Sequence, residues 1–348
     1  MSQGSTPAAY QVDPGQVRRD REAILAVWHG NLGEDARMGA KFDWFYAQCP
    51  FGEPSVCLLR AAPQAAPIGV AAAGPRRLMA AAGAIEAGVL VDLAVAAAHR
   101  SLGPAMMLQT ALAEVAGQRF GLLYGFPNPK AAPVFKRIGY SKLGEMIRYA
   151  RVLRYAGYLA RRLPRPLARL ASLPLDFAVR LRDAWRARAD RRWSARWSDA
   201  ADARFDTVWA ASLPIDGALA IRNTAFARWR FDACPLEKTR YLLLENETDG
   251  TLHAWFACQP RGDLLHVRDF WAVDASRGLD RACIDALLRA ARKAGHAAVS
   301  VEIAAEAGHL DGWLGAGFSA RSRRPVYGKW TRDGAMPPLF LTSADEDE

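Results

Sequence analysis

The chain has few residues of the types that bind metals or form disulfides. It contains five cysteines and six histidines in 348 residues, and no two cysteines form a Cys-x-x-Cys pair. An odd number of cysteines without pair spacing is typical of a reducing compartment. The histidines lack ligand spacing, so we expect no metal site. Walker and Gly-x-Ser-x-Gly patterns are also missing, which argues against a P-loop nucleotide-binding protein and against a serine hydrolase of the α/β-hydrolase type.

Long apolar runs and a secretion signal are missing too. The most apolar stretch, residues 80–98, contains Glu86 and Asp92, which argues against a membrane-spanning helix. The N-terminal residues MSQGSTPAAYQVDPGQ have no basic region followed by an apolar one. We therefore expect a cytoplasmic protein, with a peripheral location at the inner membrane surface as the alternative.

Positive charge is present but confined to one region. The formal net charge is +10, and residues 151–204 hold fourteen arginines, no lysine and five aspartates. The rest of the chain is close to neutral, which argues against a generally basic nucleic-acid-binding protein.

Three landmarks occur twice in the same order. Trp44-Phe-Tyr-Ala-Gln-Cys-Pro returns as Trp229-Arg-Phe-Asp-Ala-Cys-Pro, Asp92-Leu-Ala-Val as Asp269-Phe-Trp-Ala-Val, and a Gly-aromatic pair at 139 returns at 317. The offsets are nearly constant, which is typical of an internal repeat. We predict two copies of one domain, 1–150 and 205–340, joined by a basic amphipathic segment, 151–204. The acidic end, 341–348, is predicted to be a solvated tail.

Each copy alternates strands with helices. In the first copy we predict strands at 56–59, 68–73, 89–95 and 120–126, and helices at 104–117 and 131–137. This pattern predicts an α/β fold in which each copy has a mixed central β-sheet flanked by helices. In the basic segment, Pro164, Pro166 and Pro174 exclude one long helix, and an amphipathic helix is expected over 175–197.

Two motifs in the first copy carry a family resemblance. Arg100-Ser-Leu-Gly-Pro-Ala follows a strand that ends at Val95, and Asn128-Pro-Lys-Ala precedes Phe135 and Gly139-Tyr140. In this order and at this separation, the motifs resemble those of the GNAT superfamily of acyl-CoA-dependent N-acyltransferases. The resemblance covers both copies, and thus implies a tandem two-domain protein of that type.

The resemblance implies a binding site for acetyl-CoA or another acyl-CoA. Backbone N–H groups of the turn at a helix start would bind the pyrophosphate, where a glycine permits close approach. The strand end would pair with the pantetheine arm, and an asparagine would lie beside that arm. The implied residues are Arg100, Ser101, Leu102, Gly103 and Ala105 in the turn, Ala94 and Val95 in the strand, and Asn128 and Phe135 in the second motif. Pro104 removes one N–H donor from the turn.

The second copy departs from the motif. Arg277 stands where the motif requires a basic residue, but Asp280 replaces the glycine that corresponds to Gly103. A carboxylate would repel a pyrophosphate. We therefore expect the second copy not to bind CoA productively and to help form the acceptor cleft.

Acid and base residues are less clearly marked. Transfer to an amine requires a base for the amine proton and an acid for the leaving thiolate. Asp92 is the first candidate base and Glu86 the second, whereas Tyr124 could reach the sulfur as an acid. Phe135 stands where many family members have a tyrosine. The recurrence of an aspartate at 269 equally favours a structural role for Asp92.

The expected activity is transfer of an acyl group, most simply acetyl, to a primary amine of a small metabolite, amino sugar or amino acid. One alternative is a long-chain N-acyl amino acid synthase that uses acyl carrier protein, and another is a non-catalytic binding protein of the same fold. For residues 151–204 three interpretations remain: an interdomain helical hairpin, an interfacial membrane-binding segment, or a docking site for acyl carrier protein.

Overall fold

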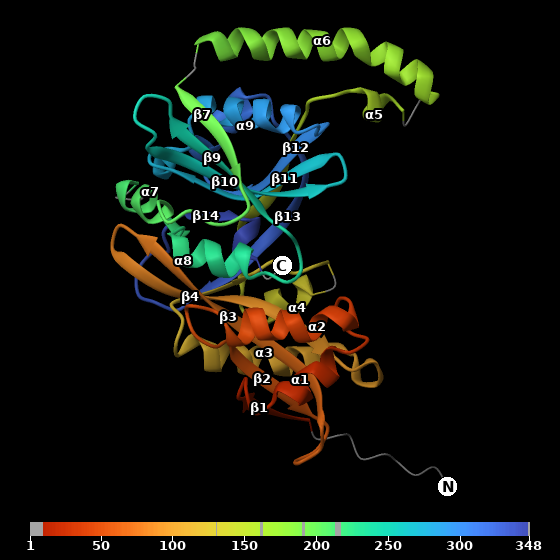
Figure 1. Ribbon diagram of the computed structural model, residues 1–348. Coiled ribbons are helices and arrows are strands. Elements are labelled where there is room, and N and C mark those ends of the chain that lie inside the picture. Colours follow the sequence, from red (N-terminus) through yellow and green to blue (C-terminus); the bar gives the residue numbers. More distant parts are fainter. Residues whose placement is uncertain (1–9, 130, 161–162, 190–191, 213–216, 347–348) are drawn as a thin grey trace.

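The fold is a mixed α/β structure built on one continuous sheet (Figure 1). The computed structural model describes residues 10–129, 131–160, 163–189, 192–212 and 217–346. The first half contains β1 (Gln11–Gly15), α1 (Arg21–Trp28), α2 (Asp35–Phe42), the π-helix η1 (Asp43–Ala47), β2 (Ser55–Arg60), β3 (Pro67–Ala80), β4 (Gly83–Val95), η2 (Ala97–His99), α3 (Leu102–Gly117), β5 (Leu122–Gly125), α4 (Ala132–Arg137) and β6 (Ser141–Val152).

The second half follows a connecting region and has a similar order of elements. The connecting region holds α5 (Ala156–Leu159) and α6 (Arg165–Ala189). The second half contains β7 (Trp193–Ser198), α7 (Phe205–Ala211), β8 (Ala218–Ala220), α8 (Thr224–Ala227), the π-helix η3 (Arg228–Asp232), β9 (Arg240–Asn246), β10 (Leu252–Arg261), β11 (Leu264–Ala272), η4 (Ala275–Arg277), α9 (Arg281–Lys293), β12 (Ala298–Ala304), η5 (Ala307–Leu310), α10 (Asp311–Gly315), β13 (Ser319–Trp330), β14 (Leu339–Thr342) and η6 (Ser343–Asp345).

The sheet joins the two halves through their last long strands. Its order is β1-β2-β3-β4-β5-β13-β6-β12-β11-β10-β9-β7, so β13 lies beside β5 of the first half and β6 lies beside β12 of the second. The pairs are antiparallel, with Tyr327 opposite Gly125 and Tyr149 opposite Val301. Each half therefore completes its sheet with a strand from the other, which the repeat in the sequence does not reveal.

Tryptophans from the repeated motif meet at the junction of the halves. The indole N–H of Trp44 donates to the carbonyl of Trp229 at 2.6 Å, and that of Trp229 donates to the carbonyl of Trp44 at 3.1 Å. Their rings stack with centroids 5.8 Å apart. The Arg76 guanidinium lies over the Trp229 ring and that of Arg230 over the Trp44 ring. These residues thus stabilise the contact between halves.

The basic segment differs from our expectation. A single helix, α6, runs from Arg165 to Ala189 with Pro174 inside it. Pro166 occupies the first helical turn, where its missing N–H costs little, and Pro174 removes only one internal hydrogen bond. The predicted helix over 175–197 is wrong at its end, because residues 193–198 form β7 and pair with β9.

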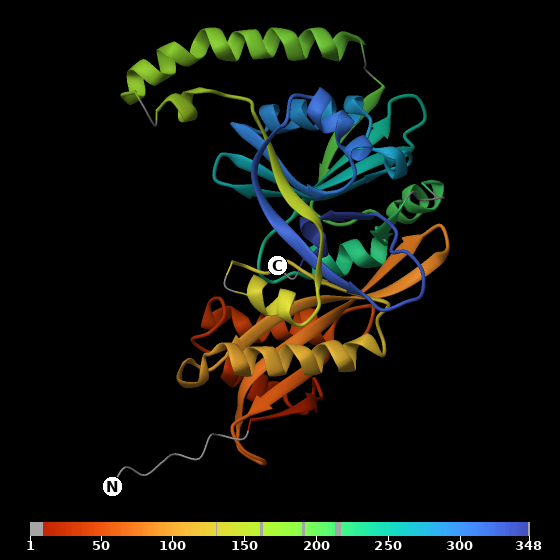
Figure 2. The ribbon, with the colours of Figure 1, turned by 180° about the vertical axis from the view of Figure 1, so that it is seen from behind.

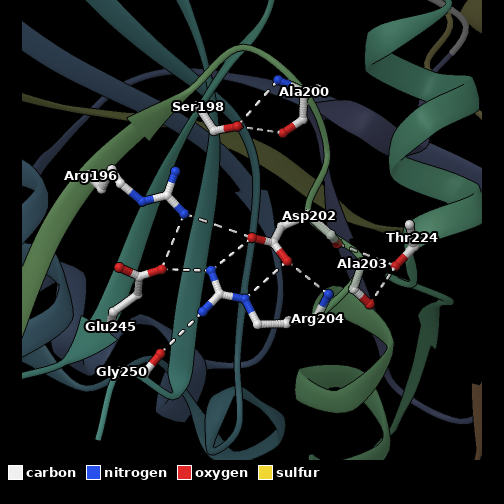
Figure 3. A network of polar contacts seen from close by, with 9 residues as sticks. All are labelled: Arg196, Ser198, Ala200, Asp202, Ala203, Arg204, Thr224, Glu245 and Gly250. Atoms are coloured by element: carbon white, nitrogen blue, oxygen red, sulfur yellow. Dashed lines mark hydrogen bonds and ion pairs between the residues drawn. The ribbon is translucent and has the colours of Figure 1, made fainter. Parts of the chain in front are cut away.

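Ion pairs fix the chain after β7 to the second half. Arg204 contacts the carboxylates of Asp202 at 2.7 Å and Glu245 at 2.6 Å, and donates to the carbonyl of Gly250 (Figure 3). Arg196 contacts the same two carboxylates. Hydrogen bonds from Arg204 lower the pKa of both acids. These two arginines are therefore already paired within the protein.

The last described residues are buried, so the prediction of a solvated tail is wrong for them. Thr342, Ala344 and Asp345 have no solvent exposure. Arg230 donates to the carbonyls of Ala344 and Glu346, and Arg222 forms an ion pair with Asp345 at 2.8 Å. Arg76 of the first half also donates to the carbonyl of Glu346 at 3.0 Å, so buried arginines of both halves surround the acidic end and compensate its charge.

Candidate functional site

The strand β4 bends where the predicted site begins. Its pairing with β5 covers Ala87–Val89 and Leu122–Tyr124. On its other edge, the register with β3 shifts between Val70 and Ala72, and Asp92 has a positive φ of 53°. An extra residue in a strand produces a bulge and bends the strand. The end of β4, with Ala94 and Val95, therefore runs beyond its pairing with β5.

Helix α3 begins next to this strand end with an uncapped N-terminus. Ser101 is its N-cap residue, and within the described chain the Ser101 side chain makes no capping hydrogen bond. A Cβ added to Gly103 would meet no described atom within 4 Å. Arg100 is exposed, and its guanidinium donates to Asn31 and to the carbonyl of Val95. Free N–H groups, open space and a nearby cation suit an anion such as a pyrophosphate.

The corresponding helix of the second half, α9, is capped. The Asp280 carboxylate accepts a hydrogen bond from the N–H of Ala282 at 3.1 Å, and Arg192 lies 3.4 Å from it. The negative charge therefore already occupies the helix N-terminus, where it interacts favourably with the helix dipole. An anionic ligand would have to displace it.

The space between β11 and β12 is also filled. These strands pair over Leu264–Val267 and Ala298–Val301. Beyond that pairing, Thr342 of β14 pairs with Ile303 of β12, and the Ser343 hydroxyl donates to the carbonyl of Arg268 in β11 at 3.1 Å. The chain's own C-terminal residues 341–345 thus lie between the strands that diverge in the second half.

A cavity of about 300 Å³ opens between the two halves. The α1–α2 region and the bulge of β4 form one wall, and η3, β10 and β11 form the other. Side chains of both charges line it, among them Trp28, Lys41, Asp92, Arg230, Gln259 and Arg268. The cavity therefore reaches the bulge of β4 from the face of the sheet opposite to α3, which packs in a separate apolar cluster.

Asp92 lies on the wall of this cavity in a buried ion pair. Its carboxylate accepts from the ammonium of Lys41 and from the hydroxyl of Tyr46, each at 2.9 Å. Lys41 and Asp92 are both 8% exposed. Asp92 therefore presents a carboxylate to the cavity that a cation and a hydroxyl hold in position.

The corresponding Asp269 is enclosed instead. It forms an ion pair with Arg222 at 3.0 Å and accepts from the hydroxyl of Thr342 at 2.9 Å, with no exposure on either partner of the ion pair. Burial raises the pKa of Asp269 to about 6, although Arg222 acts in the opposite direction. The repeated aspartate is thus structural in the second half and borders the cavity in the first.

Two of the candidate catalytic residues lie elsewhere. Glu86 forms an exposed cross-strand ion pair with Arg77 at 2.7 Å, six residues from Asp92 and hence roughly 20 Å along β4. Tyr124 is fully buried, its hydroxyl donates to the carbonyl of Asp345 at 2.9 Å, and burial raises its pKa. Neither Glu86 nor Tyr124 lines the cavity that Asp92 borders, and both side chains are bonded to other groups of the protein.

The second motif mainly shapes the turn and the core. The Asn128 side chain accepts from the N–H of Ala131 at 3.0 Å, ahead of α4. Phe135 is buried, with its ring centroid 5.2 Å from that of Tyr140 and 6.3 Å from that of Tyr327 in β13. Sequence reasoning missed Lys41, which has no motif around it. Tyr46 entered the sequence analysis only as part of the repeated motif that begins at Trp44.

Comparison with known proteins gives structural matches alone. No family model and no curated protein sequence matches the chain. A conserved protein of unknown function from Enterococcus faecalis, described as a probable N-acyltransferase, superposes with a TM-score of 0.65 at 10% identity, covering 93% of this chain and 73% of that one. GCN5-related N-acetyltransferases from Kribbella flavida (TM-score 0.61, 14% identity, 94% and 72% coverage) and Anabaena variabilis (0.60, 10%, 93% and 73%) also match.

The chain has the fold of the GCN5-related N-acetyltransferases. This confirms the expected α/β fold of GNAT type. Among the described residues, no group of three or more histidine, cysteine, aspartate or glutamate side chains is placed to hold a metal ion. No helix in the described part of the chain has the length and apolar character to cross a bilayer.

Proposed function

We propose that this chain is a tandem pair of GNAT-type units that transfers an acyl group from acyl-CoA to a primary amine. The first unit binds the acyl-CoA, and the second closes the acceptor cavity. The observation that carries the proposal is the combination, around the end of β4, of the uncapped α3 N-terminus, the bulge of the strand, and a cavity on the opposite face of the sheet that reaches Asp92.

The residues of the first half fit the CoA pyrophosphate. In the turn Arg100–Ala105, the exposed residues Ser101, Leu102 and Gly103 offer N–H donors at the start of α3, and Gly103 leaves room for close approach. The N–H of Arg100 already donates to the carbonyl of Ala97. The C-terminal end of β4, with Ala94 and Val95, offers backbone groups to the pantetheine arm. The bound thioester would supply an activated acyl carbon.

Asp92 is suited to receive the acceptor amine. Attack forms a bond from the amine nitrogen to the acyl carbon, breaks the carbon–sulfur bond, and releases one proton from the nitrogen and a thiolate. Asp92, fixed by Lys41 and Tyr46, can accept a hydrogen bond from the amine and draw off that proton. An amine on a small metabolite, amino sugar or amino acid fits a cavity of about 300 Å³. Acetyl is the simplest donor group.

The test is an acyl-transfer assay that follows release of free thiol from acetyl-CoA with a panel of amines. We expect amine-dependent thiol release that Gly103→Glu abolishes, because the new carboxylate would occupy and repel the pyrophosphate site. Gly308→Glu is the matched control, since Gly308 is also exposed and a Cβ there also meets open space. Equal activity of the two variants would contradict the proposal.

One observation favours a non-catalytic protein of the same fold. Phe135 has no proton to give, and the Tyr124 hydroxyl is bonded to the carbonyl of Asp345. Under that alternative, CoA would still bind and Gly103→Glu would still abolish binding, but no amine would cause thiol release. Binding and transfer must therefore be measured on the same preparation.

A further inference from the structure

The exposed large apolar side chains of the described residues are concentrated in and just before one helix, α6, which holds six of the eleven. Eight of the eleven large hydrophobic side chains that are exposed in the described chain lie between residues 158 and 181. Five of them form the apolar stripe of α6, with exposures of 54% to 67%: Leu167, Leu170, Leu173, Phe177 and Leu181. They follow one another at steps of three or four residues, so they share one face of the helix. The stripe is about 20 Å long.

The opposite face of α6 is attached to the protein. Ala168 and Ser172 are buried. Asp176 accepts from the backbone N–H of Tyr155 at 2.7 Å, and Asp183 forms ion pairs with Arg151 and Arg292. These contacts fix the rotation of the helix, so the apolar stripe faces away from the body. Figure 1 shows α6 at the outer end of the second half, alongside α9.

Acidic and basic side chains of α6 lie on different sides of the helix. Asp176 and Asp183 point inward, whereas Arg169 and Arg180 are exposed. Arg169 lies one turn before Leu173 and Arg180 one turn after Phe177, so both border the stripe. By contrast, the arginines of Figure 3 are neutralised by acidic partners. The outward face of α6 therefore combines apolar surface with positive charge.

We propose that α6 docks on the surface of an anionic lipid membrane, with its axis in the plane of the membrane and its apolar stripe inserted at the headgroup boundary. Basic amphipathic helices bind such surfaces by burying apolar area and by attracting anionic headgroups. A second copy of the chain fits the stripe less well, since a symmetric contact would bring the bordering arginines of both copies together.

The test is co-sedimentation of the full-length protein with vesicles of phosphatidylcholine alone, and with vesicles of equal parts phosphatidylcholine and phosphatidylglycerol. We expect binding to the anionic vesicles that weakens as salt is added. The double variant Leu170→Glu with Phe177→Glu should reduce partitioning by about a hundredfold, because two apolar side chains are lost from the buried face. Leu314→Glu, which changes an exposed leucine of α10, should bind like the unchanged protein.

A second pair of changes tests the charge separately. Arg169→Gln with Arg180→Gln should weaken binding to the anionic vesicles by about fivefold per arginine and leave binding to neutral vesicles unchanged. All variants should keep the unfolding temperature of the unchanged protein, since these side chains are exposed. Failure of the unchanged protein to bind anionic vesicles would overturn the proposal. So would a dimer in solution that the leucine and phenylalanine changes dissociate.

Discussion

The two halves of the molecule have a similar order of elements and differ at two points that bear on the proposed site. At the start of α3 the first half leaves N–H groups uncapped beside Gly103, whereas α9 is capped by Asp280. Beyond the paired part of β4 the cavity reaches Asp92, whereas residues 341–345 fill the corresponding space beside β11. The halves thus differ in whether the helix N-terminus and the space beside the strand end are open or filled.

The largest expected difference concerns the two buried aspartates. Arg222→Met should lower the free energy of unfolding by about 3–5 kcal/mol, because it leaves Asp269 and Asp345 buried without their cation. Lys41→Met should cost less, about 1–3 kcal/mol, because Tyr46 still donates to Asp92 at the cavity wall. Chemical denaturation of the two variants measures both values. Equal losses would mean that the aspartates have equivalent roles.

Substitution of the same two aspartates should have different effects on catalysis. Asp92→Asn should lower kcat by about a hundredfold or more with the affinity for CoA unchanged, since the amide is a poor proton acceptor. Asp269→Asn should affect stability and leave kcat within a few-fold, because Asp269 does not line the cavity. Steady-state kinetics on both variants decide between a base and a structural carboxylate at position 92.

The pH dependence of stability should show that His266 is buried beneath the C-terminal residues that fill the second half. Burial lowers the pKa of His266 to about 3, and its imidazole lies against the hydroxyls of Ser300 and Ser343. The unfolded chain takes up a proton at this histidine below about pH 6.5, while the folded protein stays neutral there. Stability should therefore fall as pH decreases from about 6.5 towards 4, by up to about 1.4 kcal/mol per pH unit from this group.

His266→Gln should remove that contribution. Denaturation midpoints of both proteins across this pH range give the comparison. A slope that is identical in the variant would show that His266 is protonated in the folded state or exposed to solvent.

The smallest expected difference concerns the helix caps. Asp280→Ala should destabilise the protein by about 1 kcal/mol, because the N–H of Ala282 loses its acceptor. Ser101→Ala should have little effect, since in the described structure its hydroxyl caps nothing. Thermal unfolding of the two variants tests whether α3 is uncapped in solution.

The sequence predicted the parts of this fold that local patterns encode. The alternation of strands and helices was predicted, and so was α3, although the helix begins at Leu102 and not at Pro104. The contrast between Gly103 and Asp280 was also visible in the sequence, but the role of Asp280 as a helix cap was not predicted. The exchange of β6 and β13 could not, because either strand satisfies either sheet edge and only long-range packing chooses between them. The burial of residues 342–346 was missed because acidic runs are usually solvated, and its partners Arg76, Arg222 and Arg230 are scattered along the chain.

Part of the site was likewise beyond sequence reasoning. Asp92 could be selected by its place at the end of a strand, but its partner Lys41 comes from a helix 51 residues earlier. Glu86 was a reasonable alternative on sequence position, yet the length of β4 carries it to the far end of the hairpin. Distances of this kind follow from tertiary structure alone.

The central claim is that only the first half binds acyl-CoA. Calorimetric titration of the full-length protein with CoA tests it most directly. We predict one site per chain, lost in Gly103→Glu and retained in Asp280→Ala. Two sites per chain, or one site that survives Gly103→Glu and changes with Asp280→Ala, would contradict the account.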